Sequence, residues 1–128
     1  MSFAQELTGV SIVGIEPLQA PGENPVLLSR DGSVPAAAIA IPLGEKLVIA
    51  DWINSSGLLT PFRLQKTVDG GFTWFDMALM RTGDNDANQM NNETPFIVNG
   101  GAGVAIRVLA DAPDDEVVMT TLRCQSQP

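Results

Sequence analysis

Apolar and polar residues alternate along much of this chain, in short segments interrupted by Gly, Pro, Asn or Asp. Within Gly103–Ala110, the apolar residues Val104, Ile106 and Val108 occupy every second position. Residues two apart point to the same face of a β-strand, so this spacing predicts strands. Helical periodicity fits poorly, and the best helical candidate, Phe75–Arg81, is brief and lacks a convincing cap.

Candidate strands recur at intervals of roughly 8–12 residues, with turn-forming residues between them, which is typical of a sandwich or barrel. The predicted fold class is therefore all-β: a single-domain antiparallel β-sandwich, jelly-roll or Ig-like, of about eight to nine short strands. Leu47–Ala50 shows no alternation and predicts a central strand buried on both faces. The candidate strands are Val10–Ile15, Pro25–Ser29, Ala36–Ile41, Lys46–Asn54, Leu58–Val68, Phe72–Met80, Thr94–Asn99, Gly103–Ala110 and Glu116–Cys124.

The 128 residues fit one domain, in which residues 1–25 are predicted to form an extended N-terminal arm because Pro17, Pro21 and Pro25 interrupt them. One hypothesis is that this arm docks on a neighbouring subunit or exchanges a strand with it. Phe3 and Leu7 would then be the anchoring residues. An ordered edge strand or a frayed terminus is the alternative.

Gly83–Glu93 is a long polar segment that predicts a loop, either functional or a neutral insertion. Asp84, Asp86 and Asn88 stand at alternate positions, as at the start of a calcium-binding loop. The Gly and Glu that such a loop requires later are missing, so a solvated acidic loop is favoured over an irregular calcium site. Asp114–Glu116 similarly predicts a polar turn, with a metal site as the alternative.

Composition excludes several kinds of catalysis. The chain has no His, which excludes Ser-His-Asp and Cys-His catalysis and His-containing zinc sites. Cys124 is the single cysteine, so no intrachain disulfide can form, and its place in an apolar segment predicts a small buried residue. We therefore predict that the protein is not an enzyme and binds no cofactor or metal.

The net charge of the chain limits the classes of partner that we expect. Seven basic residues against fifteen acidic ones give a formal net charge of −8 at pH 7. An anionic surface repels nucleic acids and anionic membranes, so neither is an expected partner. The N-terminus lacks the features of a secretory signal, no apolar run is long enough to cross a bilayer, and a lone cysteine suits a reducing cytosol.

The sharpest local motif is Thr67–Trp74, which matches every fixed position of the Asp-box: Ser or Thr, any residue, Asp, any residue, Gly, any residue, Thr, Trp. It resembles the repeated hairpin of sialidase-like propellers, but this chain is far too short for a propeller. The motif predicts a structural hairpin whose Asp accepts backbone hydrogen bonds, whose glycines adopt positive φ and whose Trp packs against the turn. The hairpin residues are Asp69, Gly70, Gly71, Thr73 and Trp74.

A carbohydrate-binding surface usually exposes Trp and Tyr. This chain has no Tyr and only two Trp residues, Trp52 in an apolar segment and Trp74 in the hairpin motif. Both are predicted to lie in the core, which makes a lectin a weaker hypothesis.

A small acidic β-domain with a Pro-rich N-terminal segment and polar loops resembles the structural proteins of tailed-bacteriophage virions, especially capsid decoration (cement) proteins. The stretches that carry this resemblance most are Lys46–Asn54 and Gly101–Ala110. The resemblance implies a β-rich, commonly trimeric protein that is made in the host cytoplasm, binds the major capsid protein or other virion subunits, and stabilises the phage head. The alternatives are a tail, baseplate or fibre subunit and a carbohydrate- or host-surface-binding β-sandwich.

Overall fold

The structure is a computed structural model that describes residues 8–17, 24–56, 60–82, 87–111 and 118–127. This part of the chain contains strands and turns and no helix. The strands are β1 (Thr8–Pro17), β2 (Asn24–Arg30), β3 (Ile39–Ala40), β4 (Lys46–Ser56), β5 (Pro61–Thr67), β6 (Phe75–Arg81), β7 (Ala87–Asn99), β8 (Ala105–Ala110) and β9 (Val118–Gln127).

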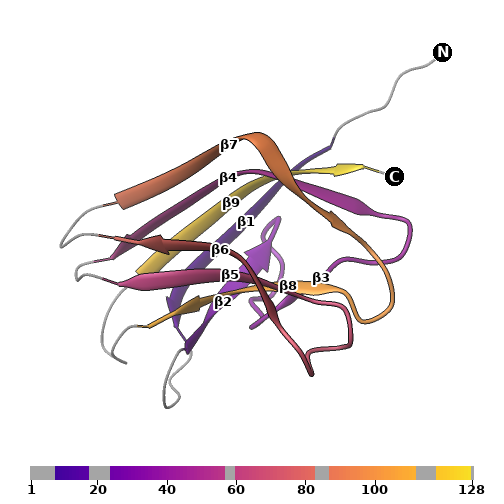
Figure 1. The fold of residues 1–128 in the computed structure, drawn as a ribbon, viewed down its shortest axis with the longest axis horizontal. Helices are drawn as coiled ribbons and strands as arrows, with labels where there is room; N and C mark the ends of the chain where they lie inside the picture. Colours follow the sequence, from indigo (N-terminus) through magenta and orange to yellow (C-terminus); the bar gives the residue numbers. More distant parts are fainter. Residues whose placement is uncertain (1–7, 18–23, 57–59, 83–86, 112–117, 128) are drawn as a thin grey trace.

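All the strand pairs are antiparallel, in the order β6-β5-β8-β2-β1-β9-β4-β7, with β3 paired to β8. One layer holds β1, β9, β4 and β7, and the other holds β8, β5 and β6 (Figure 1). β2 joins the layers because it pairs with β1 along its length and with β8 at Asn24 and Pro25. The predicted all-β, antiparallel sandwich is confirmed, and its sheet is nearly closed.

The core lies between the layers and is built from alternate strand positions. Trp52 is fully buried, and its indole nitrogen donates to the Thr120 hydroxyl at 2.9 Å. In β4, Leu47 and Ile49 are fully buried, whereas Val48 between them is partly exposed. The prediction that this segment is buried on both faces is therefore wrong. β4 is a central strand, paired with β7 and β9, but among the described residues no other layer covers the outward face of its sheet.

The N-terminal segment differs from the predicted arm over its described part. β1 pairs with β2 on one side and β9 on the other, so residues 8–17 form an interior strand rather than an extended arm or an edge. One face of this strand packs against the core, because Val10 and Ile12 are buried there while Ser11 between them is exposed. The predicted anchors Phe3 and Leu7 lie outside the described residues.

The predicted polar loop Gly83–Glu93 is wrong for residues 87–93, because β7 begins at Ala87, and residues 83–86 lie outside the described residues. Asn88 and Asn91 pair with β4 through the backbone. β7 is the last strand in the sheet order, and an edge strand needs only one backbone partner and no apolar residue at every second position. The pairing shifts between Ile49 and Asp51, so β7 carries a bulge at this point.

Three connections lie together at one end of the sandwich: residues 41–45, 68–74 and 100–104, on the right in Figure 1. Backbone hydrogen bonds join them, from the Gly70 amide to Gly103 oxygen at 3.0 Å and from the Gly100 amide to Glu45 oxygen at 2.7 Å. We call these three connections, with the adjoining Phe75, the loop end.

Candidate functional site

Thr67–Trp74 connects β5 to β6 as a closely hydrogen-bonded hairpin. The Thr67 hydroxyl donates to the Asp69 carboxylate at 2.8 Å and accepts from the Gly71 amide at 3.0 Å. The same carboxylate oxygen accepts from the Thr73 amide at 2.9 Å. The Thr73 amide, followed by the Thr67 hydroxyl, holds the pKa of Asp69 below its usual value, since both bonds favour the charged form.

The turn depends on its two glycines. Gly70 and Gly71 have φ angles of +77° and +99°, in the region that other residues rarely adopt. Because the Gly70 amide also bonds to Gly103, the hairpin is tied to the neighbouring connection between β7 and β8. The hairpin therefore has the hydrogen bonds and the backbone angles that the motif predicts, in a defined position on the sandwich.

Trp74 is the last residue of the hairpin motif and contacts the outward face of the β6-β5-β8 layer. Its indole nitrogen donates to the Gly71 oxygen at 3.0 Å, and the Arg107 guanidinium lies 4.0 Å from the ring centroid. This is a cation–π contact, worth about 0.5–1 kcal/mol at an exposed site. Trp74 is only partly buried, so the prediction that it belongs to the core is wrong, whereas the same prediction for Trp52 is confirmed.

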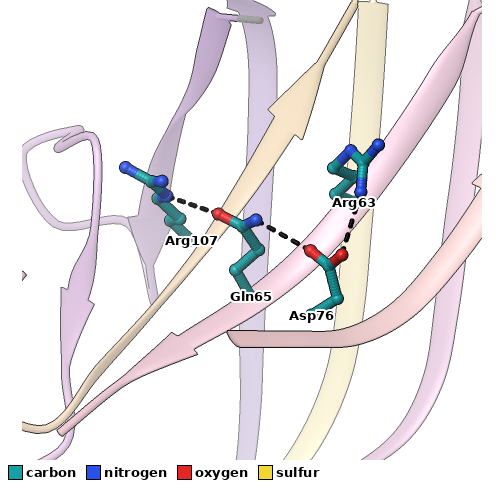
Figure 2. Close-up of polar contacts among 4 residues, drawn as sticks. All are labelled: Arg63, Gln65, Asp76 and Arg107. Carbon is teal, nitrogen blue, oxygen red and sulfur yellow. Dashed lines mark hydrogen bonds and ion pairs between the residues drawn. The ribbon is translucent and has the colours of Figure 1, made fainter. Parts of the chain in front are cut away.

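Four polar side chains form a chain of hydrogen bonds across this outward face (Figure 2). Arg107 donates through Nε to the Gln65 oxygen at 2.8 Å, and the Gln65 amide nitrogen donates to Asp76 at 2.8 Å. The other Asp76 oxygen accepts from Arg63 at 2.9 Å. Gln65 is buried in the middle of this row, where its two bonds satisfy both ends of its amide.

Strand register brings these four residues together. Gln65 of β5 lies opposite Arg107 of β8 on one side and Asp76 of β6 on the other. Arg63 is two positions before Gln65, so its side chain points to the same face. The pairing of β5 with β6 shifts between Leu64 and Gln65, and this irregularity sets the position of Asp76 relative to Arg63.

We call this surface the arginine face, defined by the outward residues Arg63, Gln65, Asp76, Leu79, Arg81 and Arg107. It carries three of the seven basic residues of a strongly acidic chain. Leu79 is 58% exposed between the arginines. A shallow depression of about 310 Å³ lies at this point, lined by Pro61, Phe62, Arg63, Leu79, Met80 and Arg81.

The side chains of the arginine face are of a kind that can bind anionic groups. Because guanidinium groups stay charged at physiological pH, they are poor proton donors in catalysis. Their N–H groups hold carboxylates in a fixed geometry. The Arg63–Asp76 pair is about 40% exposed and adds at most about 1 kcal/mol to stability after solvent screening. Its main effect is to hold two long side chains in one arrangement.

The other predicted site residues lie elsewhere. Cys124 is buried as predicted, and burial raises its pKa to about 12, so the thiol stays protonated. Asp84, Asp86 and Asp114–Glu116 lie outside the described residues. Within the described ranges, no group of three or more His, Cys, Asp or Glu side chains is placed to hold a metal ion.

The row of Figure 2 is not predicted from the sequence, although period-two spacing alone places Arg63 and Gln65 on one face of β5. The missing information was the register between the strands.

No protein-family model, curated protein or solved structure matches the chain. The described part of the chain contains no helix that could span a membrane.

Proposed function

We propose that this chain is a non-enzymatic structural protein that acts through contact with other protein subunits. Specifically, we propose a capsid decoration (cement) protein of a tailed-bacteriophage virion, which binds the major capsid protein and stabilises the head. The observation that carries the contact role is the arginine face, where hydrogen bonds order Arg63, Gln65, Asp76 and Arg107 around an exposed Leu79. The choice of a phage head as the place of attachment rests on the resemblance of the sequence to capsid decoration proteins.

The physical argument concerns the free energy of association. Ordering a long side chain at an interface costs about 0.5–1.5 kcal/mol, and this cost is reduced where the side chain is already held in the free protein. Arginine is enriched at protein interfaces, because it combines apolar packing with directed hydrogen bonds. On a symmetric shell, many such contacts of modest affinity add up to firm attachment through multivalency.

The tryptophans give no support to the carbohydrate-binding alternative. Trp52 is fully buried, and Arg107 lies over the ring of Trp74. A sugar ring stacks on an open aromatic face, so Arg107 would have to move away before a sugar could use that face of Trp74. We therefore keep glycan binding as an outcome of the test rather than as a second proposal.

The test uses the purified full-length chain and undecorated shells assembled from the major capsid protein of the same genome. The wild type should saturate the shells at a fixed number of copies, measured by co-sedimentation and by cryo-electron microscopy of the decorated shells. Leu79→Asp places a charge in the arginine face and should weaken binding at least about tenfold, which corresponds to 1.4 kcal/mol.

The matched control is Ile97→Asp. Ile97 is 53% exposed and lies on β7, in the other layer, so the same charge is introduced at a similar exposure away from the arginine face. This variant should bind as the wild type does. Absence of wild-type binding to the shells, or equal losses in both variants, would contradict the proposal. Binding to a glycan array instead would favour the carbohydrate-binding module.

A further inference from the structure

The exposed Leu79 of the arginine face lies beside two arginines. Strand pairing places Leu79 of β6 directly opposite Arg63 of β5, and Arg81 follows Leu79 by two positions on the same strand. Opposite Cβ atoms of an antiparallel pair are about 4.5–5.5 Å apart, and residues two apart on one strand are about 6.5–7 Å apart. All three residues line the depression of about 310 Å³, together with Phe62 and Met80. One hollow of the surface therefore combines an exposed apolar side chain with two guanidinium groups.

The charge of this face is opposite to that of the whole chain, which has a net charge of −8. The acidic residues on its three strands, or directly after them, are Asp76 and Asp111. Asp76 accepts hydrogen bonds from Arg63 and Gln65, and the Asp111 amide donates to the Pro61 oxygen. The three arginines of the face outnumber these two carboxylates, so the local charge is positive. Such a region attracts a carboxylate at short range, whereas the negative charge of the chain repels long polyanions.

The order of residues along β6 limits where a carboxylate of a partner can bind. The outward residues are, in order, Asp76, Leu79 and Arg81. A carboxylate placed near Asp76 is repelled, whereas one placed near Arg81 is attracted. Residues two apart in an extended segment share a face and have the same spacing as Leu79 and Arg81. An extended segment with an acidic residue two positions from an apolar one therefore matches this part of the face.

We propose that the arginine face binds an extended segment of a partner protein in which an Asp or Glu stands two residues from a large apolar residue. The carboxylate binds Arg81, with Arg63 as the neighbouring cation, and the apolar side chain fills the depression against Leu79. This inference rests on the contact role proposed above and names the chemistry of the partner's surface. It does not depend on whether the partner is a phage capsid, so the two proposals can fail separately.

The test is a selection of peptides, followed by titration. A library of random linear decapeptides displayed on yeast is selected against the immobilised full-length chain. The enriched peptide is then synthesised with a fluorescent label, and its Kd is measured by fluorescence anisotropy at protein concentrations up to about 1 mM. We expect the enriched peptides to share an acidic residue two positions from an apolar one, and their binding to weaken as NaCl is added. The same peptide with Gln or Asn in place of Glu or Asp should bind at least about fivefold more weakly.

Two variants locate the binding site on the chain, each with a matched control. Arg81→Gln should weaken binding of the selected peptide about two- to fivefold, as expected for an exposed ion pair. Its control is Arg123→Gln, which makes the same change of charge on β9, in the other layer, and should leave binding unchanged.

Leu79→Ser should weaken binding about three- to tenfold and leave its dependence on NaCl unchanged, because it removes apolar contact only. Its control is Val68→Ser at the loop end, where the side chain is 52% exposed, close to the 58% of Leu79. All four substitutions are at residues that are not buried, so circular dichroism and thermal unfolding of the variants should match those of a folded protein.

Three results would overturn this proposal. They are a selection that enriches no peptide with an acidic residue, a neutral peptide that binds as well as the acidic one, and equal effects of a variant and its control. Binding of single-stranded DNA in place of peptides, lost in Arg81→Gln, would assign the face to a nucleic acid instead. Shell binding by a wild type that selects no such peptide would leave the proposed function standing, and peptide binding by a wild type that binds no shell would support the partner chemistry alone.

Discussion

Gly100→Ala should destabilise the fold strongly, because the chain passes this point with no room for a side chain. A Cβ atom on Gly100 would overlap the backbone oxygen of Pro42 and lie 2.7 Å from that of Glu45. Gly100 also donates its amide hydrogen to Glu45, so the two connections cannot separate without breaking that bond. The methyl group therefore forces a choice between a backbone clash and a lost hydrogen bond.

Relieving the clash requires a backbone shift, which typically costs about 1–3 kcal/mol, and a lost hydrogen bond adds about 0.5–1.5 kcal/mol. We expect the free energy of unfolding to fall by about 2–4 kcal/mol and the Tm to fall by about 10 °C for a domain of this size. Urea and thermal unfolding followed by circular dichroism and tryptophan fluorescence measure both quantities.

The control for Gly100→Ala is its neighbour. A Cβ atom on Gly101 would lie 3.4 Å from a methyl group of Val104, which is a close but tolerable contact, so Gly101→Ala should change stability by less than about 1 kcal/mol. Equal effects of the two substitutions, or a Gly100→Ala protein as stable as the wild type, would refute the close packing of these connections.

Two further predictions concern ionisable groups. The lowered pKa of Asp69 means that its carboxylate stabilises the fold above its unfolded value of 3.8, and that this contribution is lost as pH falls through the lower folded value. Asp69→Ala should therefore lower the Tm at pH 7, and the difference from the wild type should shrink below pH 3.8; a constant difference down to the lowest pH measured would contradict this. The raised pKa of Cys124, about 12, predicts slow reaction with a disulfide reagent at pH 8 in the folded protein and fast reaction in denaturant; rapid reaction without denaturant would show that the thiol is not buried.

The sequence predicts where the strands lie along the chain better than it predicts their position in the sheet. Period-two alternation locates the strands that face the core on one side, as at Val108 in β8 and Leu122 in β9, because burial requires an apolar residue at every second position. It fails for residues 87–93, because an edge strand can be polar on both faces. It also fails at Val48, where a continuous apolar run occurs although only one face of β4 is buried. Local sequence does not show which strand lies at an edge or which layer covers a face.

The same limit applies to the arginine face, with one further consequence. Taken alone, the Asp-box motif predicts a hairpin and no function. Its last residue, Trp74, nevertheless makes a cation–π contact with the Arg107 guanidinium. Arg107 bonds Gln65, and Gln65 bonds Asp76, so the turn at Asp69 is linked to the far side of the face through consecutive contacts. A motif that is structural by itself thus positions the end of a candidate binding surface. Strand register creates this link, and register depends on pairings between residues as far apart as Gln65 and Arg107, which the spacing of residues within one segment cannot supply.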